Sequence, residues 1–150
     1  MPLGGAVSPE TFDKIQIGQV FQTSAAFDGG EMDRFAALSG DFSAIHADLK
    51  TAKRFGFTDR LQYGFLLTAL LSRIVGENFE HAVCAAVALD FTKPVVVGER
   101  VDVRAEVTQV QESMRSVVLK IAMLRGGDVV VRGKLTIMFL RQPASNSIEI

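Results

Sequence analysis

The chain has 150 residues, 48% of them hydrophobic, and a formal net charge of −1 at neutral pH. This length and apolar content suit one globular domain with a substantial core. A charge near zero, without a basic run or basic residues interleaved with aromatic ones, argues against binding to nucleic acid or to an anionic membrane. The single cysteine, Cys84, lies in an apolar run, so we expect a buried core residue and neither a disulfide nor a cysteine-based metal site.

The first residues, from Met1, lack a basic segment followed by an apolar one, which argues against a secretory signal peptide. The most apolar stretch, at 61–77, is interrupted by polar and charged residues and is too short to span a bilayer. We therefore expect a cytoplasmic protein made of one domain over residues 1–150, with loosely held ends at about 1–10 and 143–150.

The first half of the chain predicts one strand followed by three helices. Alternating apolar and polar residues from Ile15 to Phe27 predict a turn and a first strand. Residues 31–38 predict a short helix with acidic residues in its first turn and Gly40 beyond its end. A second short helix is expected at 47–55. The third, at 64–77, is apolar on almost all sides, a pattern typical of a buried helix.

The second half of the chain alternates with a period of two residues and predicts an antiparallel sheet. Strands are expected at 83–92, 101–108, 117–123 and 129–139, with turn chemistry at 125–128. Such a sheet has one apolar face that another element must cover. The helix at 64–77 is the predicted element long enough to do so. The expected fold class is therefore α+β, with a curved antiparallel sheet wrapped around a long central helix.

Two residues that can transfer protons, Asp41 and His46, lie between the first two predicted helices. On a continuous helix their side chains would point about 140° apart, so the backbone between them has to leave the helix if they act together. Gly40 and Ser43 are residue types that permit such a break. We expect a carboxylate–imidazole pair on a loop above the start of the helix at 64–77. Taken singly, either residue is more often structural than catalytic.

The chain resembles a known family in four segments, which are SGDFSAIHAD (39–48), AKRFGF (52–57), YGFLLTALLS (63–72) and LDFTKPVVVGE (89–99). These segments are similar to the MaoC-like (R)-specific enoyl-CoA hydratases and dehydratases, which have the hot-dog fold. The resemblance covers residues 12–140, and Asp41 and His46 match the family in type and spacing. Three positions differ, because the family has asparagine at Ser43, proline at Ala44 and histidine at Tyr63.

The resemblance implies that water adds across the 2,3-double bond of an enoyl-CoA thioester, or leaves in the reverse reaction, without a metal or a cofactor. Asp41 would act as the base, and His46 would orient the water and share the proton transfer. The N–H of Gly64, at the positive end of a helix, would stabilise negative charge on the thioester oxygen. Ser72 would support Asp41 with a hydrogen bond, and Tyr63 would either contact the substrate or only pack against the sheet.

Two other functions stay open at this point. A thioesterase with the same fold would release the free acid, and a non-catalytic subunit would bind acyl thioesters without turnover. The central helix offers more apolar surface than one small sheet covers, so we expect a homodimer. The resemblance implies the same, with the acyl site at the boundary between the subunits. The length of the acyl chain and its carrier, coenzyme A or acyl carrier protein, also stay open.

Overall fold

The computed structural model describes residues 8–144, which contain five strands in one antiparallel sheet with the order β1-β3-β4-β5-β2. The strands are β1 (Val20–Ala26), β2 (Ala82–Phe91), β3 (Arg100–Gln111), β4 (Ser116–Arg125) and β5 (Asp128–Phe139). The helices are α1 (Gly29–Ser39), α2 (Ala44–Ala47), α3 (Leu49–Arg54) and α4 (Gly64–Asn78), preceded by a 3-10 turn at Phe12–Lys14.

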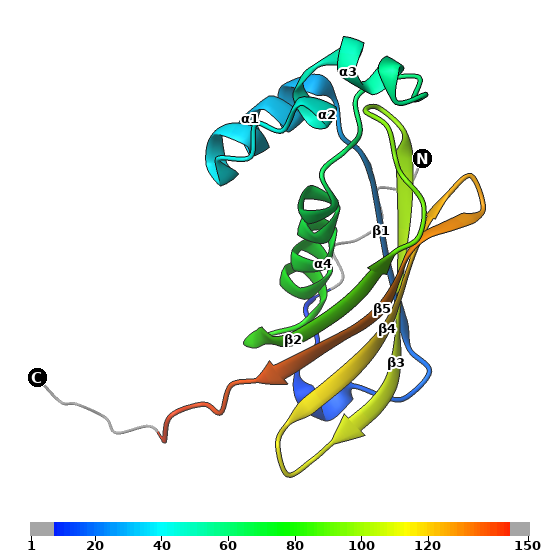
Figure 1. The fold of residues 1–150 in the computed structure, drawn as a ribbon. Helices are drawn as coiled ribbons and strands as arrows, with labels where there is room; N and C mark the ends of the chain where they lie inside the picture. The colour runs from blue at the N-terminus through cyan, green and yellow to red at the C-terminus, as the bar shows by residue number, and fades with distance from the viewer. Residues whose placement is uncertain (1–7, 145–150) are drawn as a thin grey trace, which may run out of the picture.

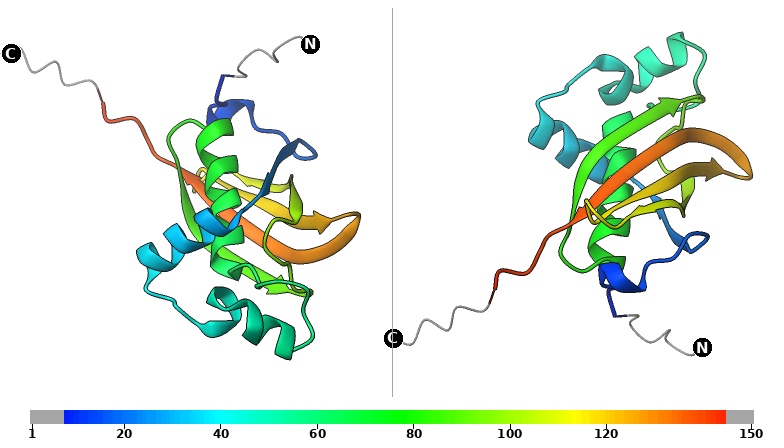
Figure 2. Two further views of the ribbon diagram at one scale, coloured as in Figure 1. Left: turned by 90° about the horizontal axis from the view of Figure 1, so that it is seen from above. Right: turned by 90° about the horizontal axis from the view of Figure 1, so that it is seen from below.

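The sheet is curved, and α4 runs along its concave face (Figure 1). The helices α1, α2 and α3 gather at one end of the molecule, beyond the N-terminal end of α4, in each further view (Figure 2). The expected α+β arrangement of a curved antiparallel sheet around a central helix is confirmed. It places the segment that contains Asp41 and His46 above the start of α4.

The core lies between α4 and the sheet. Along β3 the residues alternate, so that Val101, Val103, Ala105 and Val107 are at most 2% exposed while their neighbours face solvent. From α4 the buried residues are Leu66, Leu67, Leu70, Leu71 and Ile74. Each such leucine contributes about 1.5–3 kcal/mol through burial, which is enough to fix the helix against the sheet. The N-terminal end of α4 therefore has a defined position beside the site.

In the single chain α4 is only half covered, which corrects the expectation of a helix buried on all sides. The sheet covers one face, while Phe65 is 78% exposed and Ser72 is also exposed. The neighbouring edge strand β2 is likewise open, and Val87 is 54% exposed. Cys84, which we expected in the core, lies exposed on this strand. An apolar strand edge and the uncovered face of α4 thus lie on the same side of the molecule.

The predicted turn before the first strand is confirmed, and one predicted helix is divided. The turn lies at Gly18, which has a φ of +95°, and the strand begins at Val20. The helix predicted at 47–55 is divided at Asp48, whose backbone is extended. Its carboxylate accepts hydrogen bonds from N–H groups of the first turn of α3 and so starts a new helix there.

The loose ends that we expected fall mainly on residues 1–7 and 145–150, which lie outside the described residues. Glu10 belonged to the same expectation but is tied to the body of the protein, because its N–H donates to the Asn78 carbonyl at 2.8 Å. Glu10 also forms a β-bridge with Phe79. No helix within residues 8–144 has the length and apolar character needed to cross a membrane.

Candidate active site

The connection between α1 and α2 interrupts the helical backbone, as the sequence predicts. Gly40 ends α1 in the left-handed conformation, at a φ of +76° that would cost another residue about 1–2 kcal/mol. Its N–H donates to the Ala36 carbonyl at 2.8 Å. The chain re-enters a helix at Ala44, so His46 lies within the short helix α2 and only Asp41 lies on the loop itself.

The carboxylate of Asp41 is held by Ser43. Its Oδ1 accepts hydrogen bonds from the Ser43 hydroxyl at 2.5 Å and from the Ser43 N–H at 3.0 Å. These two bonds, with a smaller contribution from the charge of His46, hold the pKa of Asp41 below its ordinary value. Asp41 is therefore ionised at neutral pH and accepts protons. Ser43 was expected to permit the break in the helix, but its hydrogen bonds to the Asp41 carboxylate, which form a local turn, were not predicted.

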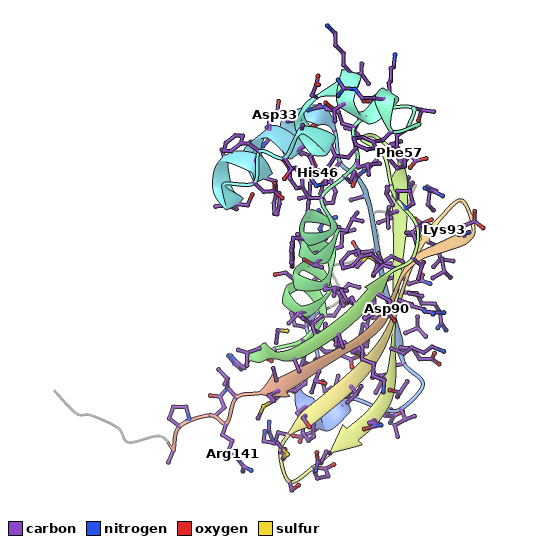
Figure 3. All side chains as sticks on the ribbon, viewed as in Figure 1. Asp33, His46, Phe57, Asp90, Lys93 and Arg141 are labelled. Carbon is purple, nitrogen blue, oxygen red and sulfur yellow. The ribbon has the colours of Figure 1, made fainter. Side chains whose placement is uncertain are left out.

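The imidazole of His46 is oriented by the main chain. Its Nδ1 lies 2.8 Å from the carbonyl oxygen of Leu61. Because a carbonyl oxygen only accepts, Nδ1 carries the hydrogen, and Nε2 is an acceptor whenever the ring is neutral. Figure 3 shows His46 between α2 and the start of α4. The sequence reasoning missed Leu61, since a backbone carbonyl 15 residues away leaves no signal in the side-chain pattern.

Tyr63 joins the two residues of the pair. Its ring stacks on the His46 ring, with centroids 4.1 Å apart and planes at 28°. Its hydroxyl donates to the main-chain oxygen of Asp41 at 2.8 Å. The side chain is buried, and burial, followed by the nearby charge of Asp41, raises the pKa of its hydroxyl. The hydroxyl therefore stays protonated and bonded to the protein, while contact of Tyr63 with a substrate stays a prediction.

Gly64 is the first residue of α4, and its N–H has no hydrogen-bond acceptor within residues 8–144. The next turn is closed normally, because the N–H groups of Leu66 and Leu67 both donate to the Tyr63 carbonyl. Gly64 borders a hollow of about 340 Å³ beside the ring of Phe91. A backbone donor at the positive end of a helix, next to open space, has the chemistry of an oxyanion-binding group.

Ser72 lies apart from the other four residues predicted for the site. It is exposed, about 12 Å further along α4 than Gly64 at 1.5 Å per residue. Within the described chain the Asp41 carboxylate accepts from Ser43, and no bond from Ser72 to it is present. Support of Asp41 by Ser72 thus stays a prediction. No group of three or more His, Cys, Asp or Glu side chains in residues 8–144 is placed to hold a metal ion.

Comparison with known proteins gives the same family as the motifs. The model of the MaoC like domain matches residues 13–124. The (R)-specific enoyl-CoA hydratase of Aeromonas caviae is 30% identical over 126 residues, which cover 82% of this chain and 94% of that protein. The mitochondrial 3-hydroxyacyl-[acyl-carrier-protein] dehydratase FERN of Solanum lycopersicum is 27% identical over 127 residues, which cover 83% of this chain and 77% of that protein.

The solved structure of the (R)-hydratase from A. caviae involved in PHA biosynthesis matches with a TM-score of 0.81 at 29% identity, covering 85% of this chain and 98% of that chain. This similarity confirms the hot-dog fold. The two relatives are named as a hydratase and a dehydratase, which are hydro-lyases, the enzyme class expected from the sequence. Since the family model spans most of the chain and the fold agrees, the chain belongs to the MaoC-like dehydratase family.

Proposed function

We propose that this protein adds water to a trans-2-enoyl thioester to form the (R)-3-hydroxyacyl thioester, and catalyses the reverse dehydration. The observation that carries the proposal is that Asp41 and His46 both contact Tyr63, the residue directly before the N-terminal glycine of α4. The pair and the backbone N–H donor of Gly64 are thereby connected through one residue. The (R) configuration is supported by the relative of 30% identity that is named for it.

In the proposed hydration, Asp41, His46 and the Gly64 N–H each have a separate role. The water oxygen attacks C3 of the enoyl group, and one of its protons passes to the ionised Asp41 carboxylate. His46 accepts a hydrogen bond from the same water at Nε2 and so orients it. The electron pair of the double bond moves toward the thioester oxygen, where the Gly64 N–H donates; one such donor contributes about 2.7–4 kcal/mol. The proton that Asp41 received then passes to C2, which restores the ionised carboxylate.

We place the acyl chain in the apolar hollow of about 500 Å³ between α4 and β2. Leu71 and Val75 line it from the helix, and Val87 lines it from the strand. Of the larger residues on α4, Leu67 and Leu71 are buried and Phe65 is 78% exposed. Apolar walls of this kind suit a hydrocarbon chain better than a polar substrate.

The test is a hydration assay with trans-2-enoyl-CoA substrates of four to twelve carbons, with chiral analysis of the product. Formation of the (R)-3-hydroxyacyl-CoA supports the proposal. Release of free thiol would instead indicate a thioesterase, and binding without turnover across the series would indicate a non-catalytic acyl-binding subunit. Both of these outcomes contradict a hydratase.

The carrier of the acyl group is identified by a parallel assay with the same enoyl chains attached to acyl carrier protein. The A. caviae relative is named for coenzyme A and the tomato relative for acyl carrier protein. We propose coenzyme A as the carrier, a choice that the sequence left open, and the cytoplasm as the location, as the sequence led us to expect. Faster turnover of carrier-protein thioesters than of coenzyme A thioesters at equal concentration would overturn the proposal that coenzyme A is the carrier.

We also propose that the reaction needs no metal and no resident cofactor, because water, the two side chains and a backbone donor supply each step. Dialysis against EDTA is expected to leave the hydration rate unchanged. The rate is measured before dialysis, after dialysis, and after adding magnesium or zinc. Loss of activity that a divalent cation restores would contradict this prediction.

We propose that two chains associate through β2, which forms one edge of the sheet. Val83, Val87 and Phe91 on this strand are 44%, 54% and 50% exposed. An exposed apolar edge strand offers unpaired N–H and C=O groups to another strand. A second copy that pairs with β2 would cover both this edge and the open face of α4, and so complete the expected homodimer.

Size exclusion with light scattering is expected to give the dimer mass at micromolar protein, and Val87→Lys is expected to give monomers. A lysine there would place a charge in the middle of the strand interface, where it would lose water. The matched control is Val129→Lys, because Val129 is 39% exposed but lies at the start of β5, before the residues that pair with β2. A monomeric wild-type protein would contradict the proposal.

A further inference from the structure

We propose that Tyr63 is a positioning residue that fixes Asp41 and His46 relative to each other; its effect on rate rests on the proposed hydration reaction. Its hydroxyl donates to the main-chain oxygen of Asp41 at 2.8 Å. Its ring stacks on the imidazole of His46 with centroids 4.1 Å apart. One side chain that contacts both members of the pair through different atoms sets the distance between them.

Tyr63 is itself held rigidly. Its side chain is 3% exposed, and the ring of Phe35 from α1 packs on it at 4.8 Å between centroids. The preceding residue, Gln62, joins it to the segment before β3, since the Gln62 N–H donates to the Val95 carbonyl at 2.7 Å and its side-chain amide donates to the Val96 carbonyl at 3.1 Å. Tyr63 therefore cannot move without disturbing α1 and this segment.

The same short segment restrains His46 a second time. Leu61, two residues before Tyr63, accepts from Nδ1 of His46 through its carbonyl oxygen and donates its own N–H to the Ile45 carbonyl at 3.1 Å. The imidazole is thus held at one edge by Leu61 and on one face by Tyr63.

The loop is otherwise restrained by bonds to nearby residues, such as that of the Asp41 N–H to the Ser39 hydroxyl at 3.1 Å. Ala44 stands where a proline would fix φ, so the backbone angle at this position is not fixed by the residue type. Ser43 binds the Asp41 carboxylate but belongs to the same loop, so that bond moves with the loop. The hydroxyl of Tyr63 is the bond that ties Asp41 to the start of α4. Loss of this hydroxyl is therefore expected to loosen the loop and leave the fold intact.

Tyr63→Phe removes the hydroxyl and keeps the ring stacked on His46. We expect kcat for hydration to fall about 10-fold while KM changes less than about twofold, because the reacting groups are displaced and substrate contacts are not. Tyr63→Leu also removes the stacking ring and is expected to lower kcat by about 10²-fold.

The matched control is Thr51→Val. Thr51 also loses a hydroxyl that makes one hydrogen bond, to Asp48 at 2.7 Å in the neighbouring α3, but it contacts neither residue of the pair. This variant is expected to keep the wild-type kcat and KM. Melting curves of all variants are recorded so that rates are compared per folded protein.

A second measurement does not depend on turnover. The N–H of Ser43 donates to Asp41 Oδ1, and the N–H of His46 donates to the Ser43 carbonyl, each at 3.0 Å. Amide hydrogen exchange followed by NMR is expected to be faster at both positions in Tyr63→Phe and unchanged in Thr51→Val.

Two results would overturn the positioning role. One is unchanged exchange of the loop amides in Tyr63→Phe. The other is a loss of rate that follows only the folded fraction or that appears in KM and not in kcat. If the wild-type protein hydrates no enoyl thioester, the proposed reaction fails, and the exchange measurement still decides whether Tyr63 fixes the loop.

Discussion

Asp41→Asn and His46→Gln are each expected to lower hydration turnover by about 10²–10⁴-fold, the range for groups that transfer protons. Asparagine keeps the shape of the side chain and can still accept from Ser43, but it has no negative charge with which to take a proton. Glutamine keeps a polar group at position 46 but lacks the imidazole ring that bonds to Leu61. The measurement is the hydration rate on a medium-chain trans-2-enoyl-CoA, with circular dichroism melts on the same samples.

The double variant Asp41→Asn/His46→Gln is expected to be little worse than the poorer single variant, because residues that act as a unit do not lose rate additively. If the two residues were only structural, their losses of hydration rate would add, and the remaining activity would be proportional to the folded fraction. Asp48→Asn and His81→Gln are matched controls, since Asp48 caps α3 and the exposed His81 pairs with Glu80. Full-rate turnover by a well-folded Asp41→Asn protein would remove the basis of the proposed reaction.

Gly64→Val is expected to lower kcat by about 10²–10³-fold, the effect of losing one oxyanion donor. A branched side chain at the first residue of α4 would keep the thioester oxygen away from the N–H. The structure adds a second effect, because a Cβ at this position would lie 2.9 Å from Cε1 of Phe91. The contact is with the ring end of the Phe91 side chain and not with the backbone, so the ring can turn aside and the loss of thermal stability is expected to be small beside the loss of rate.

The variant Gly64→Val/Phe91→Ala separates these two effects, with Phe91→Ala alone as its reference. If the rate loss comes from the blocked N–H, removing the phenylalanine ring does not restore it. Recovery of the rate in the double variant would assign the loss to crowding against Phe91. Full activity of folded Gly64→Val would contradict the oxyanion role.

The elements of the fold were predictable where a local period coincides with burial. Alternation from Val101 to Val107 predicts a strand with one buried face, and β3 has that face. The apolar segment from Gly64 predicts a helix, because it has the length of a helix and no proline before Asn78. The break between Asp41 and His46 was predictable because Gly40 favours the left-handed end of a helix. These signals arise from neighbouring residues and need no knowledge of the rest of the chain.

The exposure of β2 was decided by the tertiary structure. Its residues are apolar on both faces, a pattern that reads the same for a strand in the middle of a sheet and for one at its edge. The order β1-β3-β4-β5-β2 places it at the edge, so Cys84 and Val87 are exposed in the single chain. The predicted burial of Cys84 was wrong for this reason.

The sequence by itself determined which residue types stand at the site, namely the carboxylate of Asp41, the imidazole of His46 and the glycine that starts α4. Only the tertiary structure decided how they are held. The carbonyl of Leu61 contacts His46, 15 residues away in the chain, and the hydroxyl of Tyr63 contacts Asp41, 22 residues away. Such contacts depend on how the end of the sheet and the start of α4 pack together, and a backbone carbonyl is present at every residue, so no local pattern marks the one that orients His46.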